Sequence, residues 1–135
     1  MKAQELIEEY DELYPNTRSM DIKMKWLKRI EQTIMNEVIL THEALENEVA
    51  GAEDFDKETY FDDWGENKEL LIDSPFTNVY ITYLVAQEAQ VNMEDDRFNT
   101  AATLHNNDYL AFQQYFNRTH KPVENPSAWL SHRRL

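Results

Sequence analysis

Apolar residues recur at three- and four-residue steps in four stretches of the chain, with polar residues at the positions between them. This period is typical of amphipathic helices that bury one face. The first predicted helix covers about residues 3–14, and Pro15 ends it. The second covers about residues 21–40, where one continuous stripe is formed by Ile22, Trp26, Ile30, Ile34 and Val38.

Two further helices are predicted in the second half of the chain. The third should begin at Pro75 with Asp73 or Ser74 as its cap, because Pro is favoured at the first helical position. It should weaken in the polar stretch 92–96, and a fourth helix over about 95–117 should pack against it as an antiparallel pair. The residues predicted to form the core or a subunit interface are Trp26, Tyr80, Tyr83, Phe98, Tyr109, Phe112 and Phe116.

Residues 41–74 show no steady period and contain twelve acidic residues against two lysines. A connection of this length is unusual inside a compact domain and tends to be functional or disordered. Its aromatic residues are too apolar to be left all in water. We therefore expect a long acidic loop that packs in part, forms a short hairpin, or docks on a neighbouring subunit through Phe55, Tyr60, Phe61 and Trp64.

Composition favours a small all-α bundle of about four helices. Two glycines and four prolines are too few turn formers for a many-stranded barrel or sandwich. Pro122 and Pro126 bar further helix, so we predict a helical domain over 1–118 and an extended, net basic C-terminal arm over 119–135. No run approaches the roughly 20 apolar residues that cross a bilayer, so no membrane is expected as a partner.

The net charge of −13 disfavours proteins that grip nucleic acid through phosphates, which need clustered Lys and Arg. The absence of cysteine excludes disulfides, thiolate metal sites and a cysteine nucleophile.

Motifs for catalysis or metal binding are not found. Asp54-Phe55-Asp56 opens like a calcium loop, but Thr59 stands where Gly is needed and Gly65 where Glu is needed. His105 lies on the apolar stripe of the fourth helix, which favours a hydrogen-bonded core histidine over a ligand or catalytic base. We therefore expect no enzyme activity, no cofactor and no metal site.

Several short strings nevertheless occur in a distinctive order along most of the chain. They are Tyr14-Pro15-Asn16, Lys25-Trp26-Leu27, Glu69-Leu70-Leu71, Ser74-Pro75-Phe76, Val79-Tyr80, Tyr83-Leu84 with Ala86-Gln87, Arg97-Phe98-Asn99, and Tyr115-Phe116-Asn117-Arg118-Thr119-His120. In this order the chain resembles the helical head-to-tail connector adaptors, or head completion proteins, of tailed bacteriophages. It departs from them at Asn92-Met93-Glu94, where members of the group often carry Asn-Gly-Glu.

The resemblance implies a structural virion protein that is made in the host cytoplasm and ends in the neck of the particle. It implies a ring of twelve copies beneath the portal protein, a tail-side neck or stopper protein below, and genome DNA that passes through the lumen without specific binding. It also implies that the C-terminal arm docks on the portal or a neighbour, with Trp129 and Leu130 as anchors and Arg133 and Arg134 as charge partners. A frayed terminus is the alternative for this arm.

Two other functions are left open by the residues. One is a small acidic partner-binding regulator of phage origin, such as a DNA mimic that occupies the nucleic-acid groove of an enzyme. The other is an enzyme, for which His105 is the residue to substitute. A mimic should work as a monomer or dimer, whereas an adaptor should form a ring with the portal protein.

Overall fold

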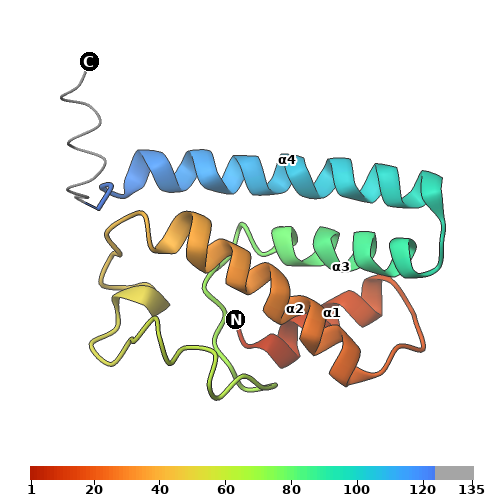
Figure 1. Cartoon of the computed structure of the whole chain (residues 1–135), viewed down its shortest axis with the longest axis horizontal. Coiled ribbons are helices and arrows are strands. Elements are labelled where there is room, and N and C mark those ends of the chain that lie inside the picture. Colours follow the sequence, from red (N-terminus) through yellow and green to blue (C-terminus); the bar gives the residue numbers. More distant parts are fainter. Residues whose placement is uncertain (124–135) are drawn as a thin grey trace.

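The computed structural model describes residues 1–123, which form a small bundle of four α-helices without β-strands in that range. The helices are α1 (Ala3–Leu13), α2 (Met20–Ile34), α3 (Asn78–Val91) and α4 (Asp95–Thr119). Figure 1 shows α4 at one edge of the molecule, with α3 beside it and α1 and α2 farther from α4. The predicted all-α bundle is therefore confirmed.

α3 is the central helix, because it packs against α1, α2 and α4. The buried residues of α3 lie nearly all round the helix and include Ile81, Val85 and Ala89. Val91, at its C-terminal end, is half exposed. The antiparallel pairing of α3 with α4 is observed as predicted.

The second helix differs from the prediction at its C-terminal end. α2 ends at Ile34, and the chain continues as one wider π-helical turn, η1 (Met35–Ile39). Val38 and Ile39 stay buried in this turn, and the Leu40 amide donates to the carbonyl of Met35 at 3.0 Å. The buried apolar stripe of α2 thus extends through η1 to Ile39, although the α-helix itself ends at Ile34.

The predicted start of the third helix is wrong. Residues 74–77 form a separate turn, and α3 begins at Asn78 with Thr77 as its cap residue. The carboxylate of Asp73 does not cap α3. It accepts a hydrogen bond from the terminal ammonium group of Met1 at 3.3 Å, and this contact ties the segment before α3 to the start of α1.

The acidic segment 41–74 packs against the bundle, which was one of the predicted alternatives. It forms no hairpin, which was another. Its one regular element is a single 3₁₀ turn, η2 (Val49–Gly51). A Cβ atom on Gly51 would lie 1.9 Å from the carbonyl oxygen of Leu45, so this close approach of two backbone segments requires glycine. The segment is held to the core by Tyr60, Leu70, Leu71 and Ile72, all of which are buried.

The end of α4 also differs from the predicted domain boundary. α4 continues to Thr119, and the next residues turn back onto the start of the acidic segment. The amide of Glu43 donates to the carbonyl of Lys121 at 2.7 Å, and the amide of Val123 donates to the carbonyl of Thr41 at 3.0 Å. Residues 119–123 are therefore part of the folded domain, and the remainder of the predicted arm lies outside the described residues.

Candidate functional site

The most unusual polar group in the described part of the chain is Glu31, a glutamate of α2 with no exposed surface. Its Oε1 accepts a hydrogen bond from the Tyr80 hydroxyl at 2.6 Å, and its Oε2 accepts one from the Leu71 amide at 2.8 Å. The Tyr60 hydroxyl lies 2.9 Å from Oε2. One carboxyl group thereby joins α2, α3 and the acidic segment.

The hydrogen bonds around Tyr60 indicate that Glu31 carries a proton. The Tyr60 hydroxyl has one hydrogen but lies within bonding distance of two oxygen atoms, Glu31 Oε2 and the carbonyl oxygen of Glu69. A carbonyl oxygen can only accept, so the Tyr60 hydrogen points to Glu69. Every group is then satisfied if a protonated Glu31 donates to the Tyr60 oxygen.

Burial supports the same protonation state. Desolvation raises the pKa of Glu31 to about 7, although the hydrogen bonds that Tyr80, Leu71 and Tyr60 can donate to its ionised form act in the opposite direction. The pKa values of the Tyr60 and Tyr80 hydroxyls are raised as well, chiefly by burial and also by Glu31 in its ionised form. Because Glu31 is closed off from solvent, we interpret the cluster as a set of buried hydrogen bonds that stabilises the fold, and not as a catalytic site.

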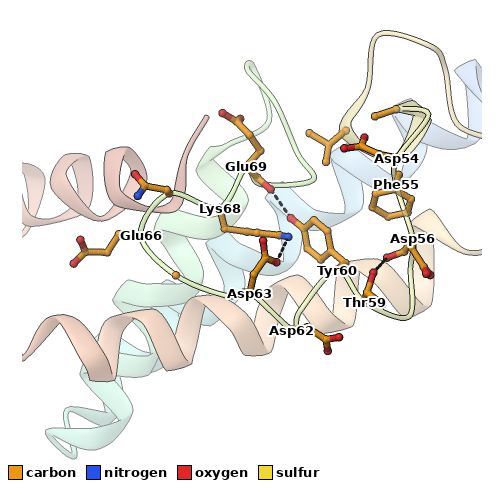
Figure 2. Close-up of a pocket in the computed structure, with 14 residues that line it drawn as sticks. Asp54, Phe55, Asp56, Thr59, Tyr60, Asp62, Asp63, Glu66, Lys68 and Glu69 are labelled. Carbon is orange, nitrogen blue, oxygen red and sulfur yellow. Dashed lines mark hydrogen bonds and ion pairs between the residues drawn. The ribbon is translucent and has the colours of Figure 1, made fainter.

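Outside this cluster the acidic segment forms an open hollow of about 810 Å³ (Figure 2). Tyr60 and Phe55 lie in its wall, and their ring centroids are 5.7 Å apart. One basic side chain, that of Lys68, is in the lining. The acidic residues of the lining are Asp54, Asp56, Asp62, Asp63, Glu66 and Glu69.

Lys68 neutralises part of this hollow by contacts within it. Its Nζ lies 2.6 Å from Asp63 Oδ1 and 4.3 Å from the centroid of the Tyr60 ring. The ion pair lowers the pKa of the Asp63 carboxyl. Figure 2 shows Lys68 extending across the hollow between Asp63 and Tyr60. Of the other carboxylates in the lining, that of Glu69 lies 3.2 Å from the terminal ammonium group of Met1.

A second cluster fastens the end of α4 to the acidic segment. The ring of His120 stacks on Phe116 with 3.5 Å between centroids, and His42 contacts the same Phe116 ring edge-on at 5.2 Å. His120 Nε2 lies 2.7 Å from Glu48 Oε1. Neither histidine was assigned a role from the sequence.

His105 has the surroundings that the sequence predicted. It is half-buried between α3 and α4, and its Nδ1 lies 3.0 Å from the carbonyl oxygen of Val79. Since that oxygen can only accept, Nδ1 carries the hydrogen. Desolvation lowers the pKa of His105, so the ring is neutral at pH 7.

The predicted core aromatic residues fall into two groups. Trp26, Tyr80, Phe112 and Phe116 are buried, whereas Tyr83, Phe98 and Tyr109 are half-buried and pack against the edge of the core. The Tyr109 hydroxyl donates to Glu37 at 3.0 Å. The predicted docking residues Trp129, Leu130, Arg133 and Arg134 lie outside the described residues.

Within residues 1–123 no three His, Asp or Glu side chains are grouped so that they could hold a metal ion. In the same range, no helix combines the length and the apolar character needed to span a bilayer.

Comparison with family models, with curated proteins and with solved structures gives no match.

Proposed function

We propose that this protein is a structural component of a tailed bacteriophage, a head-to-tail connector adaptor that assembles as a ring beneath the portal protein. In this role it acts by contact with other subunits, not by catalysis. Genome DNA passes through the ring, and a tail-side neck or stopper protein docks on the opposite face. The resemblance in the sequence suggests this function, and the arrangement of charge supports it.

The observation that carries the proposal is the acidic segment held in one arrangement on the bundle. Of its twelve carboxylates all but that of Glu48 are exposed, while Tyr60 and the Leu70–Ile72 strip anchor the backbone between them. The carboxylates are therefore displayed from a fixed scaffold. A surface of this kind repels phosphates, which suits a passage that DNA must cross without being retained.

The buried cluster is compatible with a structural role. Glu31 is the described carboxyl with the largest rise in pKa, a property that often marks a catalytic acid. Its hydrogen-bonding partners are two tyrosines and a backbone amide of the protein itself, and no exposed surface remains for a substrate. Its position instead fixes the acidic segment to α2 and α3.

One observation favours a second candidate, an acidic regulator that mimics DNA. The hollow of Figure 2 displays several carboxylates on one rigid surface, as a mimic of spaced phosphates would require. A basic groove of a nucleic-acid enzyme would then be the partner. This candidate predicts inhibition of such an enzyme by the free protein, whereas the connector predicts stable binding to a portal ring.

Portal binding by a truncated chain tests the connector and its arm together. We expect the full chain to bind an immobilised portal ring, and deletion of Ser127–Leu135 to reduce the amount bound at least tenfold while the circular dichroism of the helices stays unchanged. A matched variant, Trp129→Ala with Leu130→Ala, should give most of the same loss. Full binding by the truncated chain would refute the docking arm, and no binding by the full chain would refute the connector.

A further inference from the structure

The outward face of α4 is almost free of charge in a strongly acidic protein. Between Phe98 and Asn117, Asp108 is the one acidic residue, and no Lys or Arg is present. The Asp108 carboxylate faces α3, where Oδ2 accepts hydrogen bonds from Asn78 at 2.9 Å and from Thr82 at 3.1 Å. The exposed side of this stretch therefore carries no carboxylate or ammonium group.

This face also exposes apolar area at regular helical positions. Leu104 and Leu110 are 51% and 52% exposed, and both lie on turns of α4 whose inward residues pack against α3. Figure 1 shows α3 against one side of α4. The exposed residues of the central turns are Thr103, Leu104, Asn106, Asn107, Leu110, Ala111 and Gln114.

The chemistry of this face is symmetric about Asn107. Leu104 and Leu110 are three positions away on either side, and the next equivalent positions, Thr103 and Ala111, are both small. Farther out, Thr100 corresponds to Gln114, and both are polar and uncharged. At the ends Asp96 corresponds to Arg118, and these two residues carry opposite charges.

We propose that the outward face of α4 binds the same face of a second copy of this chain, with the two α4 helices antiparallel and Asn107 close to the two-fold axis. Leu104 of each copy then lies near Leu110 of the other. Asp96 of each copy lies near Arg118 of the other, at both ends of the contact. The amide of Asn107 can both donate and accept, so it can pair with its own copy.

A second copy fits this face better than a partner of different chemistry. In a two-fold contact each surface must be complementary to itself. Uncharged, symmetrically placed residues meet this condition, whereas a surface whose charges all have the same sign does not. Two copies with a net charge of −13 each repel wherever carboxylates meet, and the central turns of α4 avoid that repulsion. A basic partner would instead be drawn to the acidic segment.

This inference is independent of the connector proposal. A two-fold contact closes on itself and yields a pair, whereas a ring needs a second, head-to-tail contact. The chain could therefore pair through α4 without binding a portal, or bind a portal without pairing. Experiments on the protein alone test the pair, and experiments with portal test the connector.

Cysteine cross-linking tests the orientation directly, because the natural chain has no cysteine. Under mild oxidation Asn107→Cys should give a disulfide-linked dimer in high yield. Asn117→Cys should not, because antiparallel helices place the two copies of residue 117 about 30 Å apart at about 1.5 Å per residue. Equal yields from both variants would indicate a parallel or random contact, and no dimer from Asn107→Cys would overturn the proposal.

Sedimentation of charged variants tests the face without a cross-link. At roughly 10 to 200 µM, a range suited to the small contact of one helix pair, the natural chain should be partly dimeric. Leu110→Glu should weaken the dimer more than tenfold, whereas Gln32→Glu, an exposed change on α2, should leave the equilibrium unchanged. Circular dichroism confirms that both variants fold. A natural chain that stays monomeric, or a Leu110→Glu variant that dimerises normally, would overturn the proposal.

Discussion

At the scale of single residues, Glu31 couples the stability of the fold to pH. Its pKa is about 7 in the folded chain against an ordinary value of 4.5. Folding raises the pKa of this carboxyl, so its protonated form favours the folded state. The full stabilisation is present when the pH is below the ordinary pKa. This contribution is lost as the pH rises from about 4.5 through about 7, and it amounts to about 3 kcal/mol.

Glu31→Gln removes this titration and provides the test. Gln has one acceptor oxygen, so it cannot accept from both the Leu71 amide and the Tyr80 hydroxyl. The variant should therefore be less stable than the natural chain at pH 4.5 by about 1 to 3 kcal/mol. The difference should shrink or reverse by pH 7.5, because only the natural chain then buries a charge. Urea unfolding at both pH values measures it, and a difference independent of pH would show that Glu31 does not carry the proton.

Tyr80 is the one member of this cluster that the sequence predicted to lie in the core. Glu31 was not singled out, although it stands four residues after Leu27 and four before Met35, both buried. Its partners were not visible, because Tyr60 and Leu71 come from an aperiodic segment whose position depends on tertiary contacts. The His120 stack on Phe116 was missed for the same reason.

At the scale of elements, the connection between α3 and α4 is short and sharply bent. Met93 adopts a left-handed backbone conformation with φ of 58°, and its side chain is 85% exposed. An L-residue with a side chain pays about 1 to 2 kcal/mol for this conformation. The turn forms here without glycine because α3 and α4 pack against each other on either side of it.

Met93→Gly should therefore raise the stability of the fold. The gain is expected to be below about 1 kcal/mol, since glycine removes the backbone strain but adds freedom to the unfolded chain. Thermal unfolding followed by circular dichroism measures the change in Tm. Met93→Ala is the matched control, and it should give no gain because it keeps the Cβ atom that causes the strain.

The periodicity of apolar residues predicted where the helices lie, but it predicted the residues at which they begin and end less accurately. α1 ends at Leu13, one residue from the predicted end before Pro15, and α4 begins at the predicted Asp95. Periodicity does not distinguish an α turn from the π turn of η1, because both keep Val38 and Ile39 buried. The start of α3 was misplaced because Asp73 contacts the terminal ammonium group instead of capping the helix.

At the scale of the whole molecule, the charge of −13 should oppose both compaction and DNA binding. Salt screens repulsion among exposed carboxylates, so raising NaCl from about 20 to about 300 mM should raise the Tm by several degrees. The same samples should show no binding of duplex DNA by fluorescence anisotropy at any of these salt concentrations. A falling Tm with salt, or DNA binding at physiological salt, would contradict the assigned surface charge.

We propose that this protein works by assembling with copies of itself and with a portal protein. The most direct test is mass photometry of the full chain mixed with portal rings at physiological salt. We predict a particle heavier than the portal ring by about twelve chains of 16.1 kDa each. Portal rings of unchanged mass, with the chain never larger than a dimer, would contradict the claim and favour the acidic regulator.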